Sequence, residues 1–315
     1  MSCIKAGVVG VGHIGLNHAR LYHELEGAEL TAVFDADHLL AKKVAERYRA
    51  IACVSLEEFA AHVDLATVAT PTEYHHEVGM QLLQKGKHLL IEKPLAENRE
   101  QAEELANLAA EKELILQVGH IERFNPALEA LEEELQDPRF LEVTRLSPYP
   151  NRSIDVGVVL DLMIHDLEIV LHLVRSPVVQ IDAVGVPVLS PGEDIANVRL
   201  LFENGCVANI SASRISRNKV RKIRLFQQDT YLSLDYQKQS GYLLRLHGGK
   251  IKRHRVKVER GEPLKRELAA FVECVASGGT PKVTGSQAAV ALDLALTITR
   301  KIEEHHLRYH AQPEG

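Results

Sequence analysis

The chain of 315 residues is long enough for two domains, each with its own hydrophobic core. Its composition, 45% hydrophobic and 25% charged with a net charge of −6, is typical of a globular protein and argues against nucleic acid or a membrane surface as a partner. No apolar run has the length of a membrane span, and no signal peptide precedes the first predicted strand, so we expect a cytoplasmic protein. The cysteines are scattered without metal-like or disulfide-like spacing, and we expect no metal site.

The first predicted strand, residues 7–9, runs into a glycine-rich turn with the spacing Gly-x-Gly-x-x-Gly, and a helical pattern follows through Leu25. Strand, glycine turn and helix together present backbone N–H groups and a helix N-terminus to a phosphate. Gly10 permits the tight turn, Gly12 lets a pyrophosphate approach, and Gly15 lets the helix contact the strand. We therefore expect a dinucleotide to lie against Gly10, Gly12, His13, Ile14 and Gly15.

The second predicted strand, residues 30–34, ends in Asp35, which follows Gly15 by 20 residues. A carboxylate there accepts hydrogen bonds from the adenosine ribose and repels a 2′-phosphate, so the expected cofactor is NAD rather than NADP. The alternative is an ordinary strand-to-helix turn with a solvated aspartate.

Strands and helices continue to alternate up to residue 119. Ser55 with Glu58 predicts a capping box, and Asn98 predicts another helix start. The short apolar strands are typical of a parallel sheet covered on both faces. Residues 1–119 therefore predict a doubly wound, NAD-binding α/β domain. Its further strands are expected at 51–54, 65–69, 88–91 and 114–118, and its further helices at 39–48, 56–62, 75–85 and 98–112.

Two strand ends in this domain carry polar residues. Thr70 and Pro71 follow the fourth strand and are expected to border the cofactor, with His75 beyond them, whereas Thr72 is expected to cap the next helix. The fifth strand ends in Glu92-Lys93-Pro94. An ammonium fixed there can stabilise negative charge on a substrate oxygen. The alternative is a surface lysine that ends a strand.

Residues 120–315 predict a second domain for substrate binding and oligomerisation, an α+β domain with a large open antiparallel sheet. Hairpin signals at Asn204-Gly205 and Gly248-Gly249 lie among consecutive predicted strands between residues 178 and 258. Helices should cover one face of this sheet, and the other face is a candidate oligomer interface. Its other expected elements are helices at 126–135, 158–174, 264–277 and 286–304 and a strand at 140–146.

The apolar helix 158–174 carries Asp161 and His165, which share a face at α-helical spacing. An imidazole can accept a hydroxyl proton, and the carboxylate can orient the ring or bind a substrate hydroxyl. The alternative is a satisfied core histidine.

Three further residues are candidates for substrate binding. Arg123 offers a donor fork to a phosphate or carboxylate, and Asn125 either reaches a hydroxyl or caps the next helix. Arg152 is a second candidate for an anionic group, with a solvated surface position as its alternative.

The ordered motifs resemble the Gfo/Idh/MocA oxidoreductases, the relatives of glucose–fructose oxidoreductase and inositol dehydrogenase. They are the glycine turn, Thr70-Pro71 with His75, Glu92-Lys93-Pro94 and Asp161-x-x-x-His165, and the resemblance covers nearly the whole chain. It implies an N-terminal Rossmann domain, a C-terminal domain with an open antiparallel sheet, and homodimers or homotetramers built on that sheet. It also implies that Lys93 and His165 act on the substrate, with Asp161 beside them.

Within the family, residues 118–126 and 155–166 are similar to those of enzymes that oxidise the 3-hydroxyl of UDP-N-acetylglucosamine, a step toward a 3-amino sugar for lipid A. The sequence thus predicts an NAD-dependent dehydrogenase acting on a secondary hydroxyl of a sugar or nucleotide sugar. A different sugar or an inositol is a second possible substrate. A glycosidase that retains its NAD would instead release free sugar without net NADH, and a regulatory subunit that senses NAD would oxidise no sugar at all.

Overall fold

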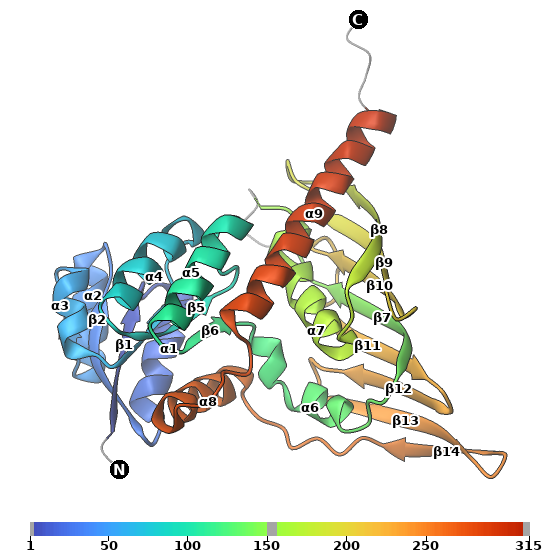
Figure 1. The fold of residues 1–315 in the computed structure, drawn as a ribbon, viewed down its shortest axis with the longest axis horizontal. Coiled ribbons are helices and arrows are strands. Elements are labelled where there is room, and N and C mark those ends of the chain that lie inside the picture. Colours follow the sequence, from blue (N-terminus) through green and yellow to red (C-terminus); the bar gives the residue numbers. More distant parts are fainter. Residues whose placement is uncertain (1–2, 150–155, 311–315) are drawn as a thin grey trace, which may run out of the picture. The chain divides into compact units, whose positions relative to one another are not determined.

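A computed structural model describes residues 3–149 and 156–310, which form two sheets with flanking helices (Figure 1). Contacts divide the chain into two compact units. Unit 1 comprises Met1–Phe124 with Glu262–Val290, and unit 2 comprises Asn125–Gly261 with Ala291–Gly315. No helix within the two described ranges is long and apolar enough to cross a membrane.

The sheet of unit 1 is parallel, with the strand order β3-β2-β1-β4-β5-β6 (Figure 1). Helices α1, α2 and α8 pack along one side, and α3, α4 and α5 pack together in another row. This arrangement is the predicted doubly wound fold. Its elements are β1 (Ile4–Val9), α1 (His13–Glu24), β2 (Ala28–Phe34), α2 (His38–Tyr48), β3 (Ile51–Ala52), α3 (Leu56–His62), β4 (Leu65–Val68), a 3₁₀ turn (Thr72–Tyr74), α4 (His75–Gln84), β5 (His88–Glu92), α5 (Arg99–Glu111), β6 (Leu116–Gly119), a 3₁₀ turn (Ile121–Phe124) and α8 (Pro263–Ser277).

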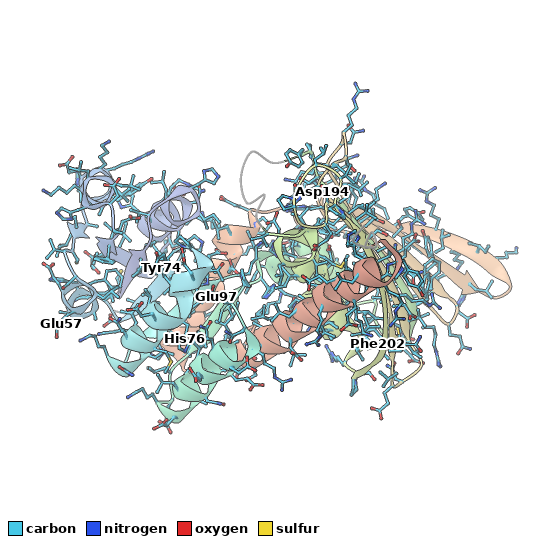
Figure 2. All side chains as sticks on the ribbon, turned by 90° about the horizontal axis from the view of Figure 1, so that it is seen from above. Glu57, Tyr74, His76, Glu97, Asp194 and Phe202 are labelled. Atoms are coloured by element: carbon cyan, nitrogen blue, oxygen red, sulfur yellow. The ribbon has the colours of Figure 1, made fainter. Side chains whose placement is uncertain are left out.

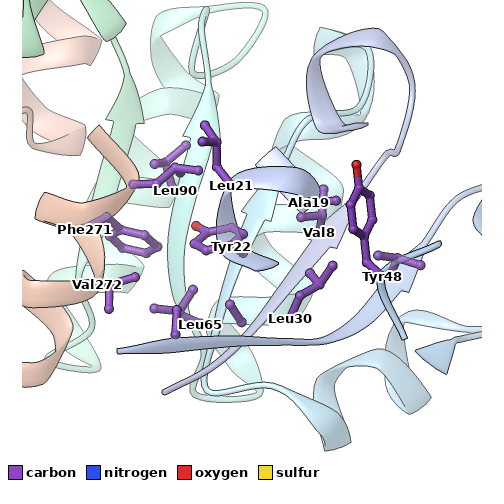
Figure 3. Packing of buried hydrophobic residues seen from close by; sticks show 14 of the residues in the cluster. Val8, Ala19, Leu21, Tyr22, Leu30, Tyr48, Leu65, Leu90, Phe271 and Val272 are labelled. Atoms are coloured by element: carbon purple, nitrogen blue, oxygen red, sulfur yellow. The ribbon is translucent and has the colours of Figure 1, made fainter. Parts of the chain in front are cut away.

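Helix α8 belongs to unit 1 although it lies far along the chain. Phe271 and Val272 of α8 pack in one buried cluster with Val8 of β1 and Tyr22 of α1 (Figure 3). The expected division into residues 1–119 and 120–315 therefore differs from the contact units, which give 262–290 to the first. An apolar helical pattern reveals that a face is buried, but it does not reveal which sheet buries it.

Unit 2 contains a sheet in the order β14-β13-β12-β11-β7-β10-β9-β8, antiparallel except for the parallel pair β7 and β10. This agrees with the expected large open sheet. Its elements are α6 (Pro126–Glu132), β7 (Pro138–Leu146), one π-helical turn (Val159–Met163), α7 (Ile164–Val174), β8 (Val178–Val186), β9 (Ile195–Phe202), β10 (Val207–Ser213), β11 (Val220–Gln227), β12 (Thr230–Asp235), β13 (Ser240–His247) and β14 (Lys250–Arg255), and α9 (Gly285–His310) begins in unit 1 and ends in unit 2.

A buried ion pair fastens α7 to this sheet. Arg145 of β7 donates from Nε to Asp166 Oδ2 (2.7 Å) and from Nη2 to Asp166 Oδ1 (3.0 Å). The hydroxyl of Tyr236 donates to the same Asp166 Oδ1 at 2.6 Å. A bidentate pair with a third donor leaves a buried carboxylate well satisfied, and it fixes both the position and the rotation of the helix.

The other face of the sheet carries a row of aromatic side chains. Phe140, Phe226, Tyr231 and Tyr242 follow one another across β7, β11, β12 and β13, with ring centroids 5.4, 4.9 and 5.9 Å apart. The guanidinium of Arg253 extends the row, 4.5 Å from the centre of the Tyr242 ring. All four aromatic side chains are half-buried. A continuous aromatic surface of this kind is typical of a face that another protein surface covers.

Local predictions from the sequence are mostly confirmed, with two exceptions. The Ser55 hydroxyl accepts the N–H of Glu58, and Asn98 caps α5 through the N–H of Gln101. Thr72, however, does not cap α4, because it starts a 3₁₀ turn and Tyr74 is the N-cap. The helix expected from residue 158 is also not a continuous α-helix, since it begins with the π-helical turn.

Candidate functional site

The glycine turn lies where β1 passes into α1, as the sequence predicts. Gly10 has φ +82°, a conformation that favours glycine. A Cβ on Gly15 would collide with the Gly10 carbonyl oxygen, so glycine alone fits there. Gly12 is the exposed N-cap of α1, and a Cβ there would meet no atom within 4 Å. The turn therefore leaves open space at a helix N-terminus that has no side-chain cap.

Asp35 is fixed against this turn. Its Oδ2 accepts the N–H of Val11 at 2.7 Å, and its Oδ1 accepts the N–H of Asp37 at 2.9 Å. Each oxygen retains capacity for another donor. These contacts hold a carboxylate at the end of β2, beside the glycine turn, which is the place where it would accept hydrogen bonds from a ribose of a bound dinucleotide.

His75 connects the ends of β4 and β5. Its ring is buried, with Nδ1 at 2.8 Å from the Pro94 carbonyl oxygen and Nε2 at 2.9 Å from the Thr70 carbonyl oxygen. Burial lowers the pKa of His75, although the two carbonyls oppose this shift. The side chain therefore ties together two loops that the sequence predicts to border the cofactor. Of the neighbouring residues labelled in Figure 2, Tyr74 is exposed and His76 is half-buried.

Glu92 ends strand β5 and Lys93 follows it, and both are half-buried. The Lys93 N–H donates to Glu92 Oε2 at 3.3 Å, and Glu92 Oε1 lies 2.9 Å from Nε2 of the fully buried His18 on α1. Burial acts to raise the pKa of Glu92, but the hydrogen bond from His18 and the charges of His18 and Lys93 outweigh it, and the pKa lies below its usual value. Glu92 is therefore a carboxylate in the folded protein.

Two further buried titratable residues surround this position. His120 follows β6, and burial, together with the nearby charge of Lys93, lowers its pKa to about 3. Glu267 of α8 has no accessible surface, and burial, reinforced by the charge of Glu92, raises its pKa well above the usual value. His120 is therefore neutral at pH 7, and its buried surroundings favour the protonated form of Glu267.

The predicted pair in unit 2 lies at the junction of the π-helical turn and α7. Asp161 is in the π-helical turn and His165 is the second residue of α7, and both side chains are half-buried. The N–H of Ile164 donates to the carbonyl oxygen of Val159, five residues earlier, so the α-helical spacing expected between Asp161 and His165 does not hold along the whole segment. Single π-helical turns of this kind often occur at functional sites.

Glu193 holds the start of this segment. Its Oε1 accepts the N–H of Val159 at 3.1 Å, and its carbonyl oxygen accepts the N–H of Val158 at 2.9 Å. A Cβ on Gly157 would collide with the Glu193 carboxylate. The neighbouring Asp194 (Figure 2) is itself paired with buried Arg214, whose Nε lies 2.8 Å from its Oδ1. The Glu193 carboxylate thus fixes the chain before Asp161, and it fits there because Gly157 has no side chain.

The other predicted substrate residues differ in placement. Arg123 is buried in the 3₁₀ turn of unit 1. Asn125 caps α6 through the N–H of Ala127 and donates to the Tyr236 carbonyl oxygen, so its capping alternative is confirmed. Arg152 lies outside the described residues, as does Asp155. Substrate binding by Arg123 and Arg152 stays a prediction.

Sequence inspection missed His18 and Glu267. Each is a polar residue on the apolar face of a helix, which was a usable signal. Both lie near Glu92 in the fold but far from it in the sequence, and 74 residues separate His18 from Glu92. Among residues 3–149 and 156–310, no group of three or more His, Cys, Asp or Glu side chains could hold a metal ion.

The titration of His120 gives a test of this buried arrangement. Above pH 6.5 the ring is neutral in the folded and the unfolded chain; as the pH falls from about 6.5 toward 3, only the unfolded chain binds the proton. The free energy of unfolding should therefore decrease over this range. Calorimetric melting temperatures between pH 7.5 and 4 should fall less steeply for His120→Asn than for the unaltered protein. His75 is present in both proteins and contributes equally, so identical slopes would contradict the assignment.

Comparison with known proteins identifies relatives of both units. Residues 4–120 match an oxidoreductase family with an NAD-binding Rossmann fold, and residues 132–230 match the Gfo/Idh/MocA C-terminal domain. UDP-N-acetylglucosamine 3-dehydrogenase of Acidithiobacillus ferrooxidans is 36% identical over 281 residues, covering 87% of this chain and 89% of the relative. Its crystal structure superimposes with a TM-score of 0.92, at 34% identity over 96% of this chain and 99% of that one.

More distant relatives share the architecture. The scyllo-inositol 2-dehydrogenase (NAD⁺) of Bacillus subtilis is 26% identical over 94% of this chain and 93% of its own length. A levoglucosan dehydrogenase solved with NADH and levoglucosan has a TM-score of 0.87 at 16% identity, covering 96% of this chain and 98% of that one, which shows a common fold.

Proposed function

Because the chain belongs to the Gfo/Idh/MocA family of NAD-binding oxidoreductases, we propose that it oxidises the 3-hydroxyl of UDP-N-acetylglucosamine with NAD. The observation that carries the choice of substrate is the similarity to the Acidithiobacillus enzyme, which extends over 87% of this chain. The open glycine turn and the fixed carboxylate of Asp35 fit the cofactor, because they offer N–H groups to a pyrophosphate and an acceptor to a ribose. Thr70, Pro71, His75 and Glu92 are proposed to complete its site.

NAD supplies an acceptor for the hydrogen on the carbinol carbon. We assign the accompanying proton to His165, whose imidazole accepts it from the sugar hydroxyl as the general base. Lys93 donates a hydrogen bond to the same oxygen and stabilises the negative charge that develops there. Asp161 orients His165 or a neighbouring hydroxyl. Arg145 and Glu193 support this chemistry indirectly, because they fix the helix and the turn that carry His165 and Asp161.

The proposal extends to the setting of the reaction. Arg123 and Arg152 are proposed to hold the substrate through its anionic groups. The product, a 3-keto sugar nucleotide, would be a precursor of a 3-amino sugar for lipid A in the cytoplasm. The aromatic row on the sheet of unit 2 supports a homodimer or homotetramer formed through that face, without nucleic acid or membrane as partner.

A second candidate substrate is another sugar or an inositol, which the similarity to inositol dehydrogenases favours. The two possibilities are distinguished by the purified protein with NAD and a panel of UDP-sugars, inositols and free aldoses, while the absorbance of NADH is followed. We expect the highest kcat/KM with UDP-N-acetylglucosamine. A higher value with an inositol would replace the substrate; release of free sugar without net NADH would indicate a glycosidase. Tight NAD binding without oxidation of any compound would indicate a regulatory protein.

The roles of Lys93 and His165 are tested by Lys93→Ala and His165→Ala. Each variant should lose about 10²–10⁴-fold in kcat, because a proton acceptor or a charge-stabilising donor is missing from the transition state. Both should bind NADH with nearly unchanged affinity in a fluorescence titration. Lys85→Ala, at an exposed position on unit 1, is the matched control and should keep full activity. Near-normal turnover in both active-site variants would remove these residues from the mechanism.

A further inference from the structure

Behind Lys93, unit 1 contains buried polar groups that the proposed reaction does not use. His18 of α1 is completely buried, yet its Nε2 lies 2.9 Å from Glu92 Oε1. This contact holds one oxygen of the Glu92 carboxylate in place. Burying an imidazole and a carboxylate is costly unless the two groups are hydrogen-bonded to each other.

The backbone fixes the second oxygen of Glu92. Oε2 accepts the N–H of Lys93 at 3.3 Å, and a Cβ on Gly119 would fall 2.9 Å from the same oxygen. The carboxylate therefore occupies a space on β6 that only a glycine leaves open. The contacts with His18 and Gly119 therefore hold the carboxylate next to the backbone N–H of Lys93.

The charge of Glu92 helps to raise the pKa of Glu267, so Glu267 does not add a second negative charge. Its carboxyl oxygens are buried, and neither has a hydrogen-bond partner among the described residues. A carboxyl group in such surroundings keeps its proton. Unit 1 thus places one carboxylate beside Lys93 and a neutral acid close to that carboxylate.

We propose that Glu92 is a positioning residue whose carboxylate, held by His18, keeps Lys93 in its ammonium form. The role deepens the proposed function, and it rests on Lys93 donating to the substrate oxygen. An opposite charge nearby favours the protonated amine, and a neighbouring cation opposes it. The titratable groups near Glu92 and Lys93 include His18 from α1, His75 from α4, His120 after β6 and Glu267 from α8, and Arg123 lies near His120. With His120 and Glu267 neutral, Glu92 supplies the negative charge that favours the ammonium form of Lys93.

The test measures the protonation of Lys93 directly. Reductive ¹³C-methylation of the full-length protein, followed by NMR titration, gives the midpoint of each lysine, and the Lys93 signal is assigned by its absence in Lys93→Arg. Glu92→Gln removes the charge and keeps the shape, so the Lys93 midpoint should fall by about one pH unit or more. Glu267→Gln replaces one neutral group by another and should leave the midpoint unchanged. No shift in Glu92→Gln, or an equal shift in Glu267→Gln, would overturn the proposal.

A second pair of variants tests the part of His18 and decides the matter if Glu92→Gln does not fold. His18→Gln keeps an N–H donor for Glu92 and should retain the Lys93 midpoint, whereas His18→Leu should lower it. Equal midpoints in these two variants would contradict the role of His18. In Glu92→Gln and His18→Leu, which should lower the Lys93 midpoint, the change of kcat at alkaline pH should also move to lower pH. Because the NMR titration needs no substrate, its outcome stands even if the protein oxidises none of the sugars tested.

Discussion

The parallel alignment of β1, β2, β4, β5 and β6 is the constraint on which the candidate cofactor site depends. Parallel strands bring their carboxyl ends to one edge, so residues that are far apart in the sequence follow neighbouring strands there. The glycine turn follows β1, Asp35 follows β2, and Lys93 follows β5. A few side chains then connect these loops: Asp35 bonds the glycine turn, and His75 bonds the loops after β4 and β5.

The position of His165, the proposed general base, depends on a buried ion pair. The helix with His165 lies on a mostly antiparallel sheet, and its position is set by a buried carboxylate, Asp166, whose two oxygens both accept hydrogen bonds from Arg145. Removing Arg145 alone would leave that carboxylate buried without its cation, an arrangement that costs about 3–5 kcal/mol in proteins. Asp166 thus fixes the helix, and the adjacent His165 is proposed to act on the substrate.

Much of unit 1 could be predicted because its signals are local. The glycine spacing, the capping residues Ser55 and Asn98, and the short apolar strands each specify structure within a few residues. That α8 belongs to unit 1 could not be predicted, because an amphipathic pattern does not indicate which sheet the helix packs against. The π-helical turn before His165 could not be predicted either, since its fixing group, Glu193, comes more than thirty residues later. His18 could not be predicted for the same reason, because its partner Glu92 is distant in the sequence.

The main proposal is that the ammonium of Lys93 and the imidazole of His165 act on the same alcohol. A crystal structure of the protein with NADH and UDP-N-acetylglucosamine tests it most directly, because reduced cofactor and alcohol cannot react with each other. The account predicts that Lys93 Nζ and a ring nitrogen of His165 both lie about 2.6–3.2 Å from the 3-hydroxyl oxygen of the sugar. A complex in which either nitrogen contacts a different hydroxyl, or no part of the sugar, would contradict it.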